Sequence, residues 1–394
     1  MSANEPVTLM EPMLPQDDGE LNDLAVDLIA KANNLAAGLN PQLTESIADL
    51  VRSMNCYYSN LIEGHNTHPR DIDKALRNDF VKDPAKRDLQ LEARSHIQVQ
   101  SVIDQGDFWQ IENLTSSEFI EKIHEEFYKD LPETLLWVKN IDGVNKLKMI
   151  AGRFRDGDVT VGRHLAPLAK NLVKFMNRFE QAYDLSKMSK LQRIIAVAAS
   201  HHRLLWIHPF YDGNGRVARL FSHALLKHLN IGSSLWSVAR GFARQNSNYK
   251  LLLEAADNVR QGDLDGRGSL SLKALHEFCK FFLEVCIDQV DYMSSILEPA
   301  ELLRRMELYV QDEVAASRLP KRSFALLREA FYQGEFARGK AAEITGYKAA
   351  QARVTLSALI EKGLLKSDTA KSPVRLAFPI EVLERWFPQL YPIA

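Results

Sequence analysis

The sequence predicts a mainly α-helical protein, with one β-hairpin in its first 300 residues and a short mixed region near its C-terminal end. Three observations support this prediction. Apolar residues recur at helical spacing through most of the chain, for example in residues 21–38. The stretch 153–162 instead has Asp-Gly-Asp between two short alternating runs, which is typical of a hairpin. After Pro299 the predicted elements become shorter and the chain becomes more basic.

Helical periodicity and capping residues predict a series of helices before residue 300. In one of them Thr44 is the expected N-cap, and Gly64 follows the last residue, Glu63, as a C-cap. We expect helices at residues 21–38, 44–63, 83–104, 116–129, 165–183, 191–207, 216–229, 247–261 and 271–293. The loop 262–268 resembles a calcium-binding loop, but Ala274 stands where the twelfth position needs an acidic residue, so we expect a glycine-rich connector.

Composition and charge exclude several classes of protein. The chain has 394 residues, of which 46% are hydrophobic and 25% charged, as in ordinary globular proteins of two or three domains. A net charge of -2 gives no overall attraction to nucleic acid or membrane. No apolar run of about 18 residues is present to span a bilayer. The first 19 residues lack the pattern of a signal peptide, so we expect a cytoplasmic protein.

The three cysteines are expected to be structural. Cys56, Cys279 and Cys286 lie in apolar, helix-like stretches, and no Cys-x-x-Cys pair suggests zinc or redox chemistry. We therefore expect buried free thiols.

The segment from His208 to Arg219 (HPFYDGNGRVAR) contains the most informative residues. Gly213, Asn214 and Gly215 permit backbone conformations in which successive N–H groups point into one concavity. The helix that follows adds its own free N–H groups and the positive end of its dipole. Arg216 and Arg219 lie three residues apart on that helix, so both add positive charge on one side. This pattern predicts a phosphate-binding loop.

Two further residues of this segment suit catalysis. Asp212 is an oxygen ligand suited to Mg²⁺ shared with phosphate oxygens. His208 titrates near neutrality in its ordinary state, so it can accept a proton from an incoming hydroxyl. A Gly-Asn-Gly loop alone is usually only a turn, and a histidine before proline is most often structural. The complete ordered set favours nucleotidyl or phosphoryl transfer.

The same string resembles the signature of the Fic family, His-x-Phe-x-Asp/Glu-Gly-Asn-Gly-Arg-x-x-Arg, at every defining position. The resemblance extends over roughly residues 45–290. It implies a helical core, ATP as donor, Mg²⁺, and transfer of AMP to a Ser, Thr or Tyr hydroxyl of a target protein with release of pyrophosphate. It implies that His208 is the general base, that Asp212 holds Mg²⁺, and that Arg219 reaches the γ-phosphate. Residues Gly213, Asn214, Gly215 and Arg216 would bind the phosphates.

The resemblance also implies roles outside the loop. The hairpin that ends at Val159, Thr160, Val161 and Gly162 resembles the flap with which the family holds its target segment. Tyr249 stands where family members place an aromatic residue beside the nucleotide. Doc-like relatives, which phosphorylate, carry a lysine and lack this Gly-Asn-Gly-Arg form, so AMP transfer is favoured. Transfer of another phosphate-linked group, such as phosphocholine, stays open.

Ser59 and Glu63 form a second motif, in the sequence Ser59-Asn-Leu-Ile-Glu63-Gly64. They are four residues apart and share one face at the end of a predicted helix. An ordinary solvated glutamate would fit this position in most proteins. Beside a Fic signature, the pair resembles the inhibitory Ser/Thr-x-x-x-Glu-Gly/Asn motif of family members with an N-terminal inhibitory helix. The resemblance implies that Glu63 pairs with Arg219 and repels the γ-phosphate.

The C-terminal region predicts a winged helix-turn-helix. Helices are expected at residues 323–332, 340–345 and 348–361, with a turn at Gly346, followed by a strand at 374–378. Residues 320–379 carry 11 Lys/Arg against 5 Asp/Glu. This excess allows DNA contact through Lys348, Gln351 and Arg353 of the third helix and through the wing residues Lys366, Lys371 and Arg375, although winged helices also bind proteins. A DNA-binding regulator whose Fic domain senses nucleotide is therefore the alternative function.

Four regions follow from these assignments. We expect a flexible N-terminus at residues 1–20, an N-terminal helical region with the inhibitory helix at 21–110, a Fic catalytic domain at 111–298 and a winged-helix-like domain at 299–394. The expected partners are ATP and a target protein, with self-adenylylation and a homodimer left open.

Overall fold

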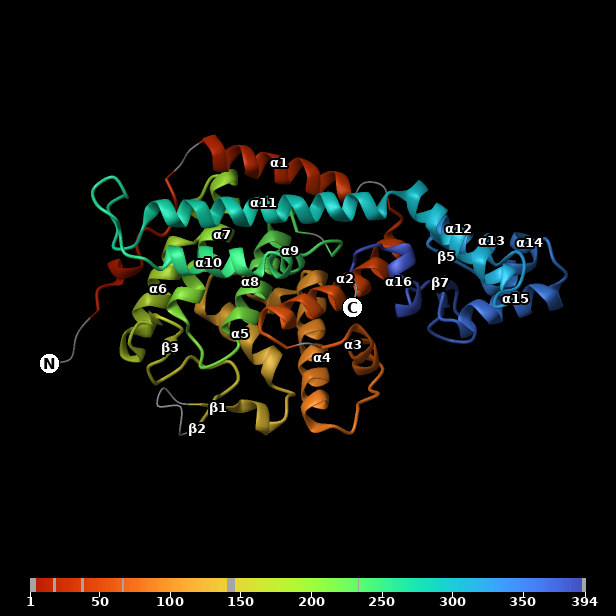
Figure 1. Cartoon of the computed structure of the whole chain (residues 1–394), viewed down its shortest axis with the longest axis horizontal. Helices are drawn as coiled ribbons and strands as arrows, with labels where there is room; N and C mark the ends of the chain where they lie inside the picture. Colours follow the sequence, from red (N-terminus) through yellow and green to blue (C-terminus); the bar gives the residue numbers. More distant parts are fainter. Residues whose placement is uncertain are drawn as a thin grey trace. The chain divides into compact units, whose positions relative to one another are not determined.

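The computed structural model describes residues 5–16, 19–36, 39–65, 67–139, 146–232 and 234–391 (Figure 1). The chain divides into two compact units, each built from separate stretches of sequence. The first unit comprises residues 1–32, 55–233 and 237–289. The second comprises residues 33–54, 234–236 and 290–394. The mainly α-helical fold that the sequence predicts is confirmed, whereas its four regions stay a prediction.

Helices make up most of the first unit. Three of the helices named here, α1, α2 and α11, are divided between the two units. The helices are α2 (Pro41–Ile62), α3 (Pro69–Leu76), α4 (Pro84–Gln105), α5 (Ser117–Tyr128), α6 (Leu172–Ala182), α7 (Lys190–Ile207), α8 (Asn214–His228), α9 (Val238–Arg244), α10 (Asn246–Ala256) and α11 (Leu272–Leu297). A further helix, α1 (Gly19–Ala36), precedes them.

The core of the first unit surrounds α7 and α8, which pack against each other and against α4, α5 and α6. Ser189 and Gln192 form a capping box that begins α7, and small residues 196–200 let neighbouring helices approach closely. All residues of α8 from Arg216 to Leu226 are buried. The loop between these two helices is therefore held by the best-packed part of the unit.

Two short hairpins lie in the first unit. One pairs β1 (Trp137–Lys139) with β2 (Lys146–Lys148), and the other pairs β3 (Thr160–Val161) with β4 (His164–Leu165). The sequence predicted a single hairpin, centred on the Asp-Gly-Asp of residues 156–158. That register is wrong, because the strands of the second hairpin flank Gly162, where φ is +59°. For the same reason α6 begins at Leu172, after the hairpin, and not at residue 165.

The N-terminal residues 5–16 belong to the first unit. Met10 is fully buried. The carbonyl of Met13 accepts a hydrogen bond from the Tyr183 hydroxyl at 2.6 Å, and that of Pro12 accepts one from Arg203 at 2.9 Å. Tyr183 directly follows α6 and Arg203 lies on α7, so this segment is bonded to both parts of the unit.

The second unit combines helices with a three-stranded antiparallel sheet of order β5-β7-β6. The sequence predicted three helices with Gly346 at the turn between the second and third; Gly346 is the left-handed C-cap of α14. Assignment to the winged-helix class stays a prediction. The elements are α12 (Pro299–Ala315), α13 (Ser323–Gln333), β5 (Glu335–Phe336), α14 (Ala341–Thr345), α15 (Ala349–Glu361), β6 (Leu365–Lys366), β7 (Val374–Leu376) and α16 (Ile380–Trp386).

The first half of α2 belongs to the second unit. Its apolar residues Leu43, Ile47 and Leu50 are buried. Asp49 forms an ion pair with Lys366 of β6, with the carboxylate oxygen 3.0 Å from Nζ. Helix α2 therefore begins in one unit and ends, with Ser59, in the other.

The described residues also bear on membrane spans and on the cysteines. Among these residues, no helix is both long enough and apolar enough to cross a bilayer. Cys56, Cys279 and Cys286 are buried free thiols, as the sequence predicted.

Candidate active site

The loop between α7 and α8 is fixed by its own side chains. His208, directly after α7, adopts a left-handed conformation with φ of 51°. The Asn214 side chain accepts a hydrogen bond from the Phe210 N–H at 3.0 Å and donates one to the Phe210 carbonyl at 2.9 Å. The Phe210 ring is fully buried and stacks on His124, with ring centroids 3.9 Å apart. Asn214 therefore uses its amide to shape the loop, and its predicted contact with phosphate stays a prediction.

Arg155 connects this loop to the segment that leads into the β3–β4 hairpin. Its guanidinium is buried and donates to the carbonyls of His208 at 2.8 Å, Gly157 at 2.9 Å and Pro167 at 2.6 Å. A cation beside the carbonyls at the end of α7 is favourable because these carry the negative end of the helix dipole. Arg155 thus fixes the backbone at His208.

His208 differs from its sequence-based expectation in its charge. Burial, together with a smaller effect of the charge of Arg155, lowers the pKa of His208 to about 4. The imidazole is therefore neutral throughout the physiological range. A neutral imidazole has a lone pair with which it can accept a proton.

Two glycines of the loop lie where a larger residue would collide. Gly213 has φ of +80°, and a Cβ atom there would lie 2.7 Å from the Tyr128 hydroxyl. A Cβ atom at Gly215 would collide with the Glu63 carboxylate. Tyr128 and Glu63 can therefore approach the backbone at these two positions only because side chains are absent.

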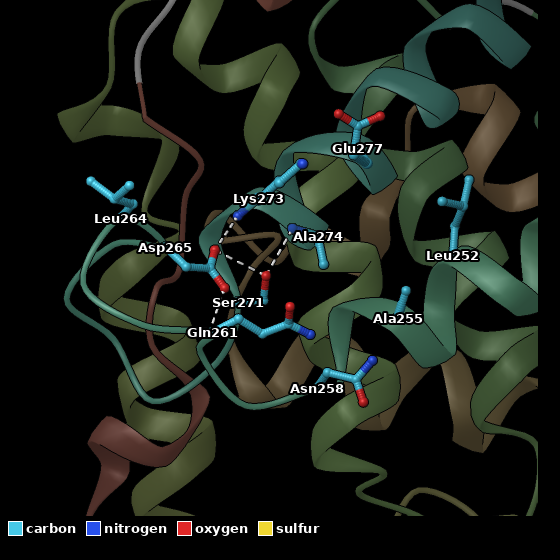
Figure 2. Close-up of a pocket in the computed structure, with 10 residues that line it drawn as sticks. All are labelled: Leu252, Ala255, Asn258, Gln261, Leu264, Asp265, Ser271, Lys273, Ala274 and Glu277. Carbon is cyan, nitrogen blue, oxygen red and sulfur yellow. Dashed lines mark hydrogen bonds between the residues drawn. The ribbon is translucent and has the colours of Figure 1, made fainter.

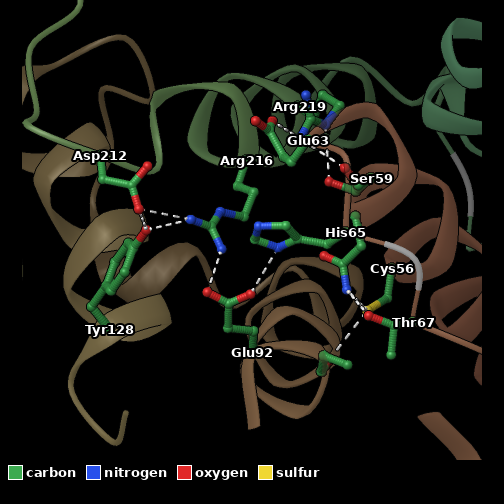
Figure 3. Close-up of polar contacts among 12 residues, drawn as sticks. Cys56, Ser59, Glu63, His65, Thr67, Glu92, Tyr128, Asp212, Arg216 and Arg219 are labelled. Atoms are coloured by element: carbon green, nitrogen blue, oxygen red, sulfur yellow. Dashed lines mark hydrogen bonds and ion pairs between the residues drawn. The ribbon is translucent and has the colours of Figure 1, made fainter. Parts of the chain in front are cut away.

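Arg216 lies at the centre of a polar cluster (Figure 3). Its side chain is 4% exposed and forms an ion pair with Glu92 of α4 at 2.9 Å. It also donates to the Tyr128 hydroxyl at 2.7 Å and contacts Asp212 at 3.1 Å. The guanidinium carbon lies 5.0 Å from the centre of the Phe127 ring. Sequence motifs suggested Arg216 but not its partners Glu92 and Tyr128.

Arg219 is occupied by the end of α2. Its Nη2 atom lies 2.5 Å from the Glu63 carboxylate, and its Nε atom donates to the Ser59 hydroxyl at 2.9 Å. Burial favours the neutral form of Glu63, but the charge of Arg219 outweighs it and lowers the pKa of the carboxyl group. The structure therefore brings together Ser59, Glu63 and Arg219, the three residues of the predicted contact, and it also places the Glu63 carboxylate against Gly215.

Asp212 lies in the loop and contacts Arg216 and Tyr128 while part of its side chain faces solvent. Its Oδ2 atom accepts the hydrogen bond from Tyr128 at 3.2 Å, and 49% of its side chain is exposed. No cluster of three or more metal-ligating side chains occurs among the residues that the structure describes. Mg²⁺ bound with a nucleotide needs only one or two carboxylates, because phosphate oxygens and water complete its shell. A single exposed aspartate beside the phosphate loop fits that requirement.

The remaining predicted residues are those of the flap and Tyr249. Thr160 and Val161 form β3, with Val161 41% exposed, and Gly162 turns into β4. Tyr249 is 2% exposed and stacks on Phe242, while its hydroxyl lies 2.8 Å from His201. The charges of Arg219 and Glu63 also act on this hydroxyl. Tyr249 is therefore a core residue beside Arg219, and its contact with a nucleotide stays a prediction.

A separate cavity of about 510 Å³ lies between α10 and the N-terminal end of α11 (Figure 2). Its polar lining includes Asp265, whose carboxylate accepts hydrogen bonds from the Gln261 and Lys273 N–H groups and the Ser271 hydroxyl, all at about 3 Å. Because these donors occupy the carboxylate, the loop functions as a connector that caps α11. None of the lining residues belongs to 208–219.

The comparisons with known proteins agree with this geometry. Residues 114–226 match the Fic/DOC family. Over these residues the chain is similar to that family. The chain is 31% identical over 216 residues to the protein adenylyltransferase Fic of Nematostella vectensis, covering 55% of this chain and 46% of that one. Over 75 residues it is 41% identical to the protein of the same name from Drosophila erecta, covering 19% of this chain and 15% of the relative.

Solved structures share the fold. A Fic family protein from Desulfovibrio desulfuricans G20 gives a TM-score of 0.53 at 17% identity and covers 92% of this chain and 98% of that one. Fic-1 (residues 134–508) from C. elegans gives a TM-score of 0.54 at 14% identity, covering 71% of this chain and 73% of that one. The match spans 46% of the length of the Nematostella vectensis protein and 15% of the length of the Drosophila erecta protein.

Proposed function

We propose that this protein is an adenylyltransferase that moves AMP from ATP to a Ser, Thr or Tyr hydroxyl of a target protein. The observation that carries the proposal is that the α7–α8 loop and the first turns of α8 together hold a neutral imidazole, two closely contacted glycines and two buried arginines. The relatives named protein adenylyltransferase Fic support the same reaction.

The residues divide the reaction between them. His208 accepts the proton of the target hydroxyl as its oxygen bonds to the α-phosphorus. The bond from that phosphorus to the bridging oxygen breaks, and pyrophosphate leaves with both electrons. The N–H groups at Gly213 and Gly215, together with Arg216, hold the β- and γ-phosphates. Asp212 would hold Mg²⁺, which supplies positive charge to neutralise the pyrophosphate group. Thr160 and Val161 offer a strand edge to the target segment.

We further propose that Glu63 restrains this activity. Its carboxylate occupies Arg219 at 2.5 Å, so the γ-phosphate would lose a cationic partner and meet a negative charge. Ser59 assists by accepting a hydrogen bond from the same guanidinium at 2.9 Å. Withdrawal of Glu63 is then required before ATP binds productively.

Labelling with ATP radioactive in the α-phosphate tests both proposals. Glu63→Gly is expected to raise incorporation into protein by about tenfold or more, because the γ-phosphate gains Arg219. His208→Ala in the Glu63→Gly background is expected to remove the incorporation. If Glu63→Gly and the unaltered protein label equally, the restraint is wrong.

Label in the γ-phosphate serves as the control. AMP transfer retains the α-label and loses the γ-label, whereas phosphorylation does the opposite. The absence of both labels with the Glu63→Gly protein and cell lysate would contradict an adenylyltransferase, and a labelled phosphocholine donor then tests the other group transfer.

The second unit favours an additional role in DNA or protein binding. Lys348, Gln351 and Arg353 are exposed on or beside α15, as a recognition surface requires. Two predicted wing cations, Lys366 and Arg375, are instead paired with Asp49 and Asp368. Salt-dependent binding of a DNA duplex, lost in a Lys348→Ala/Arg353→Ala variant, would support the DNA role. A cytoplasmic location, self-adenylylation and a homodimer stay predictions.

A further inference from the structure

Glu92 joins two parts of the site that are far apart in sequence. One of its carboxylate oxygens lies 2.9 Å from Arg216, and the other lies 3.2 Å from Nδ1 of His65. Figure 3 shows the Glu92 carboxylate facing both Arg216 and His65. Both Glu92 and His65 precede the matched residues 114–226, so neither belongs to the Fic signature. The Glu92 side chain is 7% exposed, and that of His65 is 38% exposed.

Arg216 depends on Glu92 because a buried cation needs a fixed negative partner. Its other anionic partner, Asp212, is 49% exposed and is the residue proposed to hold Mg²⁺. When Asp212 turns to a cation, Glu92 is the remaining carboxylate that contacts the guanidinium. Glu92 of α4 then fixes the orientation of the Arg216 side chain toward phosphate.

His65 is attached to the end of α2 by the backbone. Its N–H donates to the carbonyl of Asn60 at 2.9 Å, and its carbonyl accepts from the Thr67 N–H at 3.1 Å. The Asn60 side chain donates to the Thr67 hydroxyl at 3.3 Å. His65 therefore moves together with the last turn of α2, which carries Ser59 and leads directly to Glu63.

We propose that Glu92 is a positioning residue for Arg216, and that through His65 it makes Arg216 respond to the seating of the inhibitory helix. The regulatory part rests on the proposed function of Glu63. With α2 seated, Glu63 occupies Arg219 while His65 shares the Glu92 carboxylate with Arg216. When the end of α2 withdraws, His65 leaves with it, and Glu92 pairs with Arg216 alone. One helix movement thereby changes the surroundings of both phosphate-binding arginines.

The electrostatics of the cluster support this arrangement. The hydrogen bond that His65 makes to the Glu92 carboxylate raises the pKa of His65 against the effect of burial. Burial alone would raise the pKa of Glu92, but His65 and Arg216 outweigh it and lower that pKa. The charged groups that face His65 are Glu92 of α4, Arg216 of α8 and Glu63 after α2.

A double-mutant cycle on Mg-ATP affinity tests the positioning role. In the Glu63→Gly protein, Glu92→Gln is expected to weaken Mg-ATP binding about tenfold, because the neutral amide no longer orients Arg216. In the Glu63→Gly/Arg216→Ala protein, the same change should alter affinity by less than about twofold. Asp88→Asn, a charge change on the same helix, is the control and should have no effect. Equal losses in both backgrounds would indicate a merely structural glutamate and overturn the proposal.

The coupling through His65 has its own test. His65→Asn in the protein with Glu63 intact is expected to raise Mg-ATP affinity about threefold, because the end of α2 loses an anchor. It should have no effect in the Glu63→Gly background. His68→Asn is the matched control, since His68 is exposed and caps α3, a position that Asn also fills well. Unchanged affinity in the His65→Asn protein would contradict the coupling. Because binding is measured, a failure here is distinct from a failure to transfer AMP, which would count against the proposed function.

Discussion

The buried environment of His208 determines the pH range in which the proposed base can work. A base must be unprotonated before it accepts a proton, and burial lowers the pKa of this imidazole to about 4. The neutral form is therefore present above that pH and is lost as pH falls through it.

The pH profile of the Glu63→Gly protein should reflect this pKa. AMP transfer is expected to show no loss attributable to His208 between pH 8 and about pH 5, because the imidazole stays neutral there. The measurement is the initial labelling rate in buffers of constant ionic strength. A fall centred on the ordinary histidine pKa, near 6.5, would show that His208 is solvated in the working enzyme.

The pKa of His65 predicts an opposite trend for the restrained protein. The pKa is raised in the folded protein, so the pairing with Glu92 is complete below the ordinary histidine pKa and is lost as pH rises through the raised value. The labelling rate of the unaltered protein, divided by that of Glu63→Gly, is expected to increase as pH rises from about 6 to 9. In the His65→Asn protein the same ratio should stay flat. A flat ratio with His65 present would contradict the pairing as an anchor.

Sequence reasoning identifies the residues whose function is encoded locally. His208, Asp212 and Arg216 lie within nine residues of one another, so their order alone predicts a phosphate site. Glu92 and Tyr128 reach Arg216 from α4 and α5, and no local pattern distinguishes them from other helix residues. Their roles depend on tertiary packing, as does the low pKa of His208.

At the scale of elements, Arg155 connects the end of α7 to the flap segment. Its N–H groups donate hydrogen bonds to the carbonyls of His208, Gly157 and Pro167. The end of α7 and the segment around the hairpin are therefore bonded to the same buried cation. The position of the proposed base is therefore linked to the hairpin that would hold the target.

Replacement of Arg155 by lysine should separate charge from hydrogen bonding. Lysine keeps the positive charge but cannot reach three divergent carbonyls, and each buried group left unpaired costs about 1–3 kcal/mol. We expect a lower melting temperature. In the Glu63→Gly background we also expect a lower labelling rate, and the decrease should exceed the fraction of protein that has unfolded. Arg153→Lys is the control, since Arg153 is exposed two residues earlier. Full activity in Arg155→Lys would show that charge alone suffices.

The Asp-Gly-Asp stretch shows why the hairpin was placed wrongly from sequence. Asp156 accepts a hydrogen bond from the Tyr211 hydroxyl at 2.6 Å, and Asp158 accepts one from the Ala169 N–H at 2.8 Å. These contacts occupy residues that would otherwise favour a tight turn. The helices were easier to predict, because caps such as Ser116 and Ser189 act within their own segment.

For the whole molecule, the division of α2 between the two units is the main feature that sequence did not predict. Leu43, Ile47 and Leu50 are buried within the first half of the helix, and that half is counted with residues 290–394. The last turn of the same helix carries Ser59, which contacts Arg219 in the first unit. Periodicity predicts the helix, but not which unit each half joins.

Loosening the first half of α2 should therefore weaken the restraint at the second half. Ile47→Ala removes a fully buried side chain and is expected to destabilise its surroundings by about 2–4 kcal/mol. We expect faster labelling when Glu63 is intact and no acceleration in the Glu63→Gly background. An unchanged rate, together with a lower melting temperature, would show that the two halves act independently.

The continuity of α2 has a consequence for how a stimulus could reach the catalytic loop. Its 22 residues extend over about 33 Å without an intervening linker. Asp49 pairs with Lys366 in the first turns of α2. A partner that tilted or unwound these turns would displace Ser59 as well, because one hydrogen-bonded backbone connects the two positions. The tail of the chain would then need no surface of its own on the nucleotide pocket to govern when ATP is used.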